Sequence, residues 1–169
     1  MRTGLEMPPM KLKLIALAAA TLFASGAAQA QEQQWYLTGS AANGTALVLV
    51  DLSSVRLQGD QATGSALMIK LSDDEPPATL ATIRYDCTRH QFSILTGQVL
   101  DIDAKPIGDV VQGDGTLITV APGSFFEGTQ DFLCGGSAHP DPQLLIGNRM
   151  PVRAAHETLR SRKEKAEGN

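Results

Sequence analysis

The sequence lacks the short motifs that usually accompany catalysis or metal binding. Its three histidines, His90, His139 and His156, form neither an HExxH nor an H-x-H pattern, so they do not predict a metal centre. Its two cysteines are too few for a zinc site with four protein ligands. Ser124 has neither glycine of the G-x-S-x-G nucleophile elbow. We therefore expect no catalytic residue, no bound metal and no cofactor.

Phosphate-binding and calcium-binding motifs are missing as well. GDG at 113–115 has no GxxxxGK[ST] lysine and separates two expected strands, so it predicts a hairpin turn. Asp101 with Asp103, and the acidic run at 73–75, are the candidates for a calcium site. Neither has the spacing or the glycine of an EF-hand. Calcium binding is therefore an alternative and not the expectation.

Positive charge is scarce outside the C-terminal end. The chain has 14 lysines and arginines against 18 aspartates and glutamates, a net charge of −4. Nucleic acid is therefore not expected as a partner, because its recognition requires a basic surface. The last residues are the exception, with Arg153, Arg160, Arg162, Lys163 and Lys165. Such an end could contact an anionic surface, but a charge run of this length is usually only solvated.

An apolar run long enough to span a membrane is also missing. Residues 14–23 are apolar, which is short of the roughly 20 residues that a spanning helix needs. They follow a basic start and precede small residues that end in Ala28-Gln29-Ala30. This order predicts a secretory signal peptide over 1–30, cleaved after Ala30, with a membrane helix as the alternative. The mature protein is then periplasmic or secreted and has no transmembrane segment.

Period-two alternation predicts strands in the remaining chain. Ala81, Ile83, Tyr85 and Cys87 share one face of ATIRYDC, and Leu67, Ile69 and Leu71 share one face of SALMIKLS. The unbroken apolar run in TALVLVDL predicts a central strand covered on both sides. Further strands are expected near 35–38, 55–57, 91–100 and 116–120. In the strand at 91–100, Phe92 and Ile94 are expected to face inward.

Short polar joints separate these strands, which favours an antiparallel sheet because parallel pairs need long crossovers. The predicted fold is α+β, a single antiparallel sheet of about six strands with a short helix packed on it, plus a charged C-terminal helix. The strands and the short helix form one domain over 31–150. In the segment 151–169, Pro151 suits a first helical turn, and Val152, Ala155 and Leu159 form a thin apolar stripe. We expect this helix to fray into disorder.

The stretch PGSFFEGTQDFLCGG at 122–136 predicts the short helix. Ser124 and Glu127 have the spacing of a capping box, in which each side chain bonds the other residue's backbone N–H. Gly135 and Gly136 predict a left-handed stop. Gly128 is expected to cost about 1 kcal/mol inside the helix. The apolar face comprises Phe125, Phe126, Thr129, Phe132 and Leu133, while Gln130 and Asp131 are expected to face water.

The two cysteines are expected to form a disulfide. Cys87 ends a strand, Cys134 ends the helix, and an exported chain enters an oxidising compartment. Closing a loop of this length stabilises the fold by roughly 4 kcal/mol in the loop-entropy model. The alternative is a catalytic thiol at Cys87 with His90 as its neighbour, but an oxidised cysteine cannot act as a nucleophile.

Four sequence features occur in this order along the chain: Trp35, VDLSSV at 50–55, YDCTR at 85–89 and APGSFFEGTQDFLC at 121–134. In this order they resemble the surface-adhesin protein E-like family of exported Gram-negative proteins, over roughly residues 34–135. The resemblance implies an antiparallel sheet with a packed helix, a disulfide between Cys87 and Cys134, and non-enzymatic binding of proteins. The chain has no lipobox cysteine, so the resemblance does not extend to a lipid-anchored adhesin.

The function expected from this resemblance is that of an exported, disulfide-stapled binding module with a protein partner, and a homo-oligomer is possible. Its binding residues are not identified by any motif. The first alternative is an envelope-maintenance protein that associates through the basic C-terminal end. The second is a hydrolase or an enzyme inhibitor whose site no motif reveals.

Overall fold

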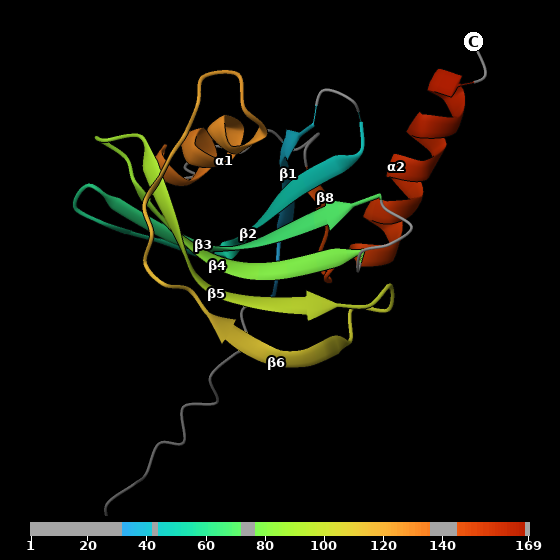
Figure 1. The fold of residues 1–169 in the computed structure, drawn as a ribbon, viewed down its shortest axis with the longest axis horizontal. Coiled ribbons are helices and arrows are strands. Elements are labelled where there is room, and N and C mark those ends of the chain that lie inside the picture. Colours follow the sequence, from blue (N-terminus) through green and yellow to red (C-terminus); the bar gives the residue numbers. More distant parts are fainter. Residues whose placement is uncertain (1–31, 42–43, 72–76, 136–144, 168–169) are drawn as a thin grey trace, which may run out of the picture. The chain divides into compact units, whose positions relative to one another are not determined.

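The computed structural model describes residues 32–41, 44–71, 77–135 and 145–167, so the predicted signal peptide lies outside the described residues. Its strands and helices follow one another along the chain as β1 (Trp35–Ser40), β2 (Ala46–Gln58), β3 (Gln61–Lys70), β4 (Ala78–Asp86), β5 (Gln91–Leu100), β6 (Pro106–Gln112), β7 (Ile118–Thr119), α1 (Phe125–Cys134), β8 (Leu145–Gly147) and α2 (Val152–Glu167) (Figure 1).

All strands belong to one antiparallel sheet in the order β6-β5-β4-β3-β2-β1-β8, and β7 also pairs with β5. The predicted α+β class and the antiparallel sheet are confirmed. Within the described residues the sheet has eight strands instead of about six: the strand expected at 55–57 is part of β2, and β6 and β8 were not expected from the sequence. Both lie at the margins of the sheet, where exposure on both faces removes the alternation that marks a half-buried strand.

Strand β2 explains how the sheet carries two cores. Leu47 and Leu49 pack with residues of α2, whereas Val48 and Val50 pack with residues of α1. Alternate residues of a strand point to opposite faces. The two helices therefore cover opposite faces of the sheet, and the expectation that TALVLVDL forms a strand covered on both sides is confirmed.

The C-terminal helix is part of the fold. Val152, Ala155 and Leu159 are buried against Trp35 and the leucines of β2, so the predicted apolar stripe is confirmed. The helix continues to Glu167, and its exposed part contains the basic residues. The expected fraying is therefore not observed within the described residues. No helix in this part of the chain is long and apolar enough to cross a membrane.

The segment GDG at 113–115 is not a hairpin turn, because β6 and β7 both pair with β5. The chain runs along β5 as one interrupted edge strand, and the Gly113 N–H donates to the Leu95 oxygen at 2.9 Å between the two paired parts. A Cβ at Gly113 would lie 1.8 Å from the Ile94 oxygen. Glycine is needed here for close backbone approach and not for a chain reversal.

Candidate functional site

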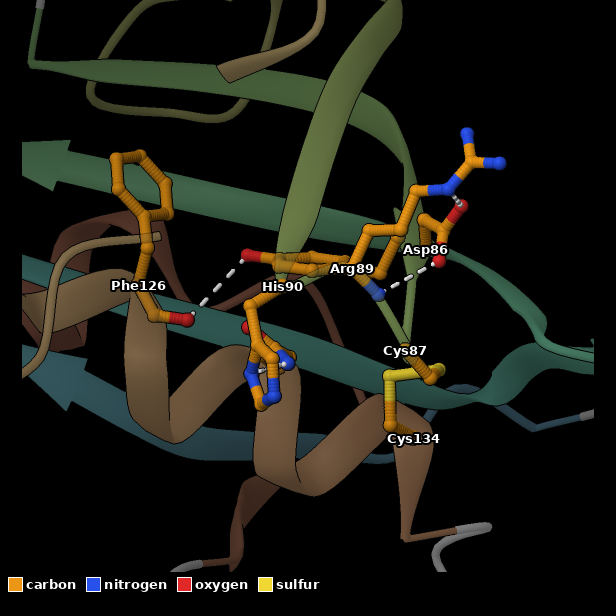
Figure 2. Close-up of a disulfide and its surroundings, with 8 residues drawn as sticks. Asp86, Cys87, Arg89, His90, Phe126 and Cys134 are labelled. Carbon is orange, nitrogen blue, oxygen red and sulfur yellow. Dashed lines mark hydrogen bonds and ion pairs between the residues drawn. A yellow bond between two sulfur atoms is a disulfide. The ribbon is translucent and has the colours of Figure 1, made fainter. Parts of the chain in front are cut away.

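The disulfide joins the two parts of the chain that the sequence suggested. Cys87 follows β4 and Cys134 ends α1, with Cα atoms 5.6 Å apart and a sequence separation of 47 (Figure 2). Neither cysteine is free in this structure, so neither thiol is available as a nucleophile. The bond fixes the end of α1 beside the turn that holds His90.

The capping box predicted for Ser124 and Glu127 does not form. Ser124 occupies the N-cap position, but its hydroxyl is buried and makes no hydrogen bond. The Ser124 N–H already donates to the Ala121 oxygen at 3.0 Å, and the Glu127 carboxylate instead accepts the N–H of Gly123 at 2.8 Å. Because the turn before the helix already uses the Ser124 N–H, the Glu127 carboxylate binds the N–H of the preceding residue instead.

The predicted left-handed stop of α1 is wrong at Gly135, whose φ of −70° is right-handed. The Gly135 N–H donates to the Asp131 oxygen at 2.9 Å, as in a continuing helical turn. Gly136 lies outside the described residues.

Two glycines let α1 lie directly against β1. A Cβ at Gly128 would be 2.2 Å from the Thr38 oxygen, and a Cβ at Gly39 would be 2.1 Å from the Phe125 oxygen. Beside this contact, the hydroxyls of Thr38 and Thr129 share a hydrogen bond of 2.9 Å. Gly39 and Gly128 together permit this close docking, which positions the side chains on the other faces of α1.

Exposed apolar side chains gather along the outer margin formed by 106–119, which we call the apolar edge. Five of the eight exposed large hydrophobic residues in the described chain lie there, each between 43% and 66% exposed: Ile107, Val110, Val111, Leu117 and Ile118. The charged side chains of the apolar edge are Asp109 and Asp114, and it contains no lysine or arginine. This margin of the sheet is therefore both apolar and acidic.

A cavity of about 360 Å³ whose lining includes two carboxylates lies beyond the end of β7, and we call it the acidic cavity. It is lined by His90, Val120, Pro122, Glu127, Gln130 and Asp131. Gln130 was expected to face water but is only 3% exposed, and its Nε2 lies 2.7 Å from the Nδ1 of His90, within hydrogen-bond distance. Its Oε1 is buried and finds no hydrogen-bond partner among the residues that the structure describes.

A second cavity of about 490 Å³ lies on the α1 face of the sheet. Its walls are mainly apolar, with Thr79 and Lys70 as the polar members, and it is lined by Met68, Lys70, Ala78, Thr79, Val99, Phe125 and Phe126. The rings of Phe125 and Phe126 lie 4.2 Å apart between centroids. They form the wall of this cavity that α1 contributes.

The carboxylates considered for calcium have other partners. Asp101 accepts the backbone N–H groups of Asp103 and Lys105 at 2.9 and 2.8 Å, and Asp103 pairs with Arg153. The hydrogen bond and charge of Arg153 lower the pKa of Asp103. The run at 73–75 and His139 lie outside the described residues, and His156 is half-buried on α2. Within the described ranges, no three His, Cys, Asp or Glu residues are placed to hold a metal.

Tyr85 is the most strongly perturbed titratable group in the described chain. Its ring packs against Phe92 with centroids 5.4 Å apart, and its hydroxyl donates to the Phe126 oxygen at 3.4 Å. Burial raises the pKa of Tyr85 above its ordinary value. A buried, protonated phenol of this kind holds the start of α1 on the sheet.

Comparisons with protein-family models, curated proteins and solved structures return no match for this chain. The site must therefore be interpreted from its own geometry and chemistry. Sequence reasoning had missed both the apolar edge and the acidic cavity. The run of Ile107, Val110 and Val111 between a proline and a glycine was the only signal for the first.

Proposed function

We propose that the protein is an exported, non-enzymatic binding module that captures an extended segment of a partner protein by strand addition at the apolar edge. The observation that carries this proposal is the exposure of β6, in which all seven residues are exposed. The resemblance to the surface-adhesin protein E-like family supports the same class of function. The disulfide and the two cores provide a rigid scaffold for the edge.

An extended segment suits this margin because an edge strand presents unpaired backbone N–H and C=O groups. Strand β6 pairs with β5 on one side, and no strand in the described residues pairs with its other side. In strand addition the main-chain bonds supply affinity, and alternate side chains supply selectivity. Pro106 and the positive φ of 71° at Gly108 interrupt the edge, which limits indiscriminate pairing.

Charge favours a partner over a second copy of the chain. Asp109 is the middle residue of β6, so symmetric pairing of two copies about this residue places like charges face to face. Like charges directly opposite each other destabilise a strand pair. A segment that carries both apolar residues and lysine or arginine can instead contact the valines and pair with the aspartates of the edge. The partner that we propose is therefore an apolar, cationic, extended segment.

The experiment uses a synthetic peptide of alternating valine and lysine and a second peptide of the same composition in blocks. Binding to the mature, oxidised protein is measured by fluorescence anisotropy. We expect the alternating peptide to bind at least about tenfold more tightly, since only it presents one apolar face as a strand. A double variant, Val110→Lys with Val111→Lys, should lose this preference, whereas Leu57→Lys, which changes an exposed leucine outside the edge, should retain it.

Equal binding of the two peptides by the wild-type protein would contradict strand addition. A preference that persists in the double variant would place the binding site elsewhere. Circular dichroism and urea unfolding of each variant show whether its fold is intact. We expect the fold to be retained, because the substituted side chains are exposed and contribute little to the core.

The second candidate function is association with an anionic envelope component through α2. Arg160 and Arg162 are exposed on this helix, while Leu159 between the helix and the sheet is buried. Deleting the helix does not test this function, because it would also remove Leu159 from the core. Replacing Arg160 and Arg162 by glutamine tests it in co-sedimentation with vesicles that contain anionic lipid. Unchanged co-sedimentation of the double variant would remove this candidate.

A further inference from the structure

The acidic cavity begins at the residue that follows the apolar edge in the chain. Val120 follows β7 directly, and its N–H donates to the His90 oxygen at 2.8 Å. Both Val120 and His90 line the cavity. A segment that pairs along β6 and β7 is therefore led by the edge toward the cavity.

The cavity contains two carboxylates without a lysine or arginine partner among the described residues, although Glu127 accepts the N–H of Gly123 at 2.8 Å. Glu127 and Asp131 are four residues apart on α1, and unpaired like charges at this spacing destabilise a helix by about 0.2 to 0.5 kcal/mol. No lysine or arginine in the described ranges pairs with either carboxylate. Figure 2 shows the nearby Arg89 turned away from His90 toward Asp86, with its Nε 3.8 Å from the carboxylate.

Gln130 adds a buried acceptor to the same wall. Its Nε2 is occupied by the His90 ring, while its Oε1 has no donor among the described residues. A buried polar atom without a partner costs about 1 to 3 kcal/mol. The wall thus offers two carboxylates that accept hydrogen bonds, and a small movement of the Gln130 amide would add its buried oxygen to them, so a ligand that donates several hydrogen bonds suits this wall.

We propose that the acidic cavity binds the guanidinium group of an arginine carried by the captured segment. This inference rests on the proposed function, since it names the residue that anchors the segment where the apolar edge ends. A guanidinium presents five N–H donors in a plane, which suits acceptors on several sides better than the three donors of a lysine ammonium. The volume of about 360 Å³ lies in the range of small-ligand sites.

The first test measures binding at the acidic cavity without strand addition at the apolar edge. Nα-acetyl-arginine methylamide is too short to form a strand, and the lysine and citrulline analogues are its matched controls. We expect the arginine compound to raise the melting temperature of the wild-type protein, because it binds the folded state only. The lysine compound should raise it less, and the uncharged citrulline compound should leave it unchanged.

The Asp131→Asn variant should abolish the effect of the arginine compound. Asp131 is exposed and its substitution removes a charge without removing a packing contact, so the fold is retained. Asp109→Asn removes a carboxylate from the apolar edge and serves as the control that should still respond. An equal response of the wild-type protein to all three compounds would overturn the assignment of the cavity.

The second test asks whether one peptide binds the apolar edge and the acidic cavity together. The alternating valine–lysine peptide is extended by arginine or by glutamine, at either end because the direction of the added strand is open. We expect one arginine peptide to bind about tenfold more tightly than its glutamine counterpart, and Asp131→Asn to remove that difference.

The outcomes separate the two proposals. If the alternating peptide binds at the edge but arginine adds nothing, the cavity assignment is wrong and the proposed function stands. If the arginine compound binds the cavity but no alternating peptide binds, strand capture is wrong and the cation site remains as an isolated property. If neither binds, both proposals are overturned.

Discussion

Replacing Gly128 by alanine should destabilise the protein, although the same change stabilises an ordinary helix. Alanine inside a helix is favoured over glycine by about 1 kcal/mol. In α1, however, the added Cβ would lie 2.2 Å from the Thr38 oxygen, against the 3.4 Å at which ordinary contact begins. The opposing atom belongs to the backbone of β1, so it cannot rotate away. The helix must therefore move off the sheet.

The magnitude follows from three contributions. Overpacking of this kind costs typically about 1 to 3 kcal/mol. Moving α1 also weakens the hydrogen bond of 2.9 Å between Thr38 and Thr129, which contributes about 1 kcal/mol. The gain in helix propensity offsets about 1 kcal/mol of this cost. We expect Gly128→Ala to lower the free energy of unfolding by about 1 to 3 kcal/mol.

Urea unfolding of the oxidised protein, followed by circular dichroism, measures this change. Gly97→Ala is the matched control, because a Cβ at Gly97 in β5 meets nothing within 4 Å. Without a clash, that substitution should be neutral or stabilise by roughly 0.5 to 1 kcal/mol. If Gly128→Ala stabilises the protein as much as Gly97→Ala does, the close approach of α1 to β1 does not limit this position and the reasoning is refuted.

Three further predictions concern the core beneath α2, the start of α1 and the buried phenol of Tyr85. Leu159→Ala should lower the free energy of unfolding by about 2 to 5 kcal/mol, because Leu159 is fully buried; Arg160→Ala is the exposed control, and equal effects would show that α2 does not dock. Ser124→Ala should raise the free energy of unfolding, by about 1 kcal/mol, because it removes a buried hydroxyl that makes no hydrogen bond; a loss near 1 kcal/mol would indicate a working N-cap. For Tyr85, the raised folded-state pKa means that stability is constant below the ordinary value of 10.0 and falls as pH rises above it. Tyr85→Phe should reduce this alkaline loss in unfolding curves, and an unchanged pH dependence would argue against burial as its cause.

The local patterns of the sequence predicted the interior of the sheet well. The alternation in Ala81, Ile83 and Tyr85, and the continuous run through Val48 and Val50, place these residues in the core because burial requires apolar side chains at those positions. The predicted pair of cysteines forms the disulfide. In each of these predictions, the face that a residue occupies is set by the residues next to it in the chain.

The helix start shows why other predictions failed. The spacing of Ser124 and Glu127 is correct for a capping box, but the spacing does not reveal that the turn at Ala121 already occupies the Ser124 N–H. Gln130 likewise has the position of a solvent-facing residue until His90, forty positions earlier, is brought beside it by the β4–β5 turn. Competition for a hydrogen-bond partner is a property of the folded neighbourhood.

The sequence by itself determined the types of the buried elements, the central strand, the cysteine pair and the apolar stripe of the last helix, because periodicity and composition are local and set which surfaces must be buried. Only the tertiary structure decided which margin of the sheet remains open, how closely α1 approaches β1, and that Glu127, Gln130 and Asp131 border one cavity beside the edge. These features arise where segments distant in the chain meet. No local pattern encodes such a meeting, since it is selected by the packing of the whole domain.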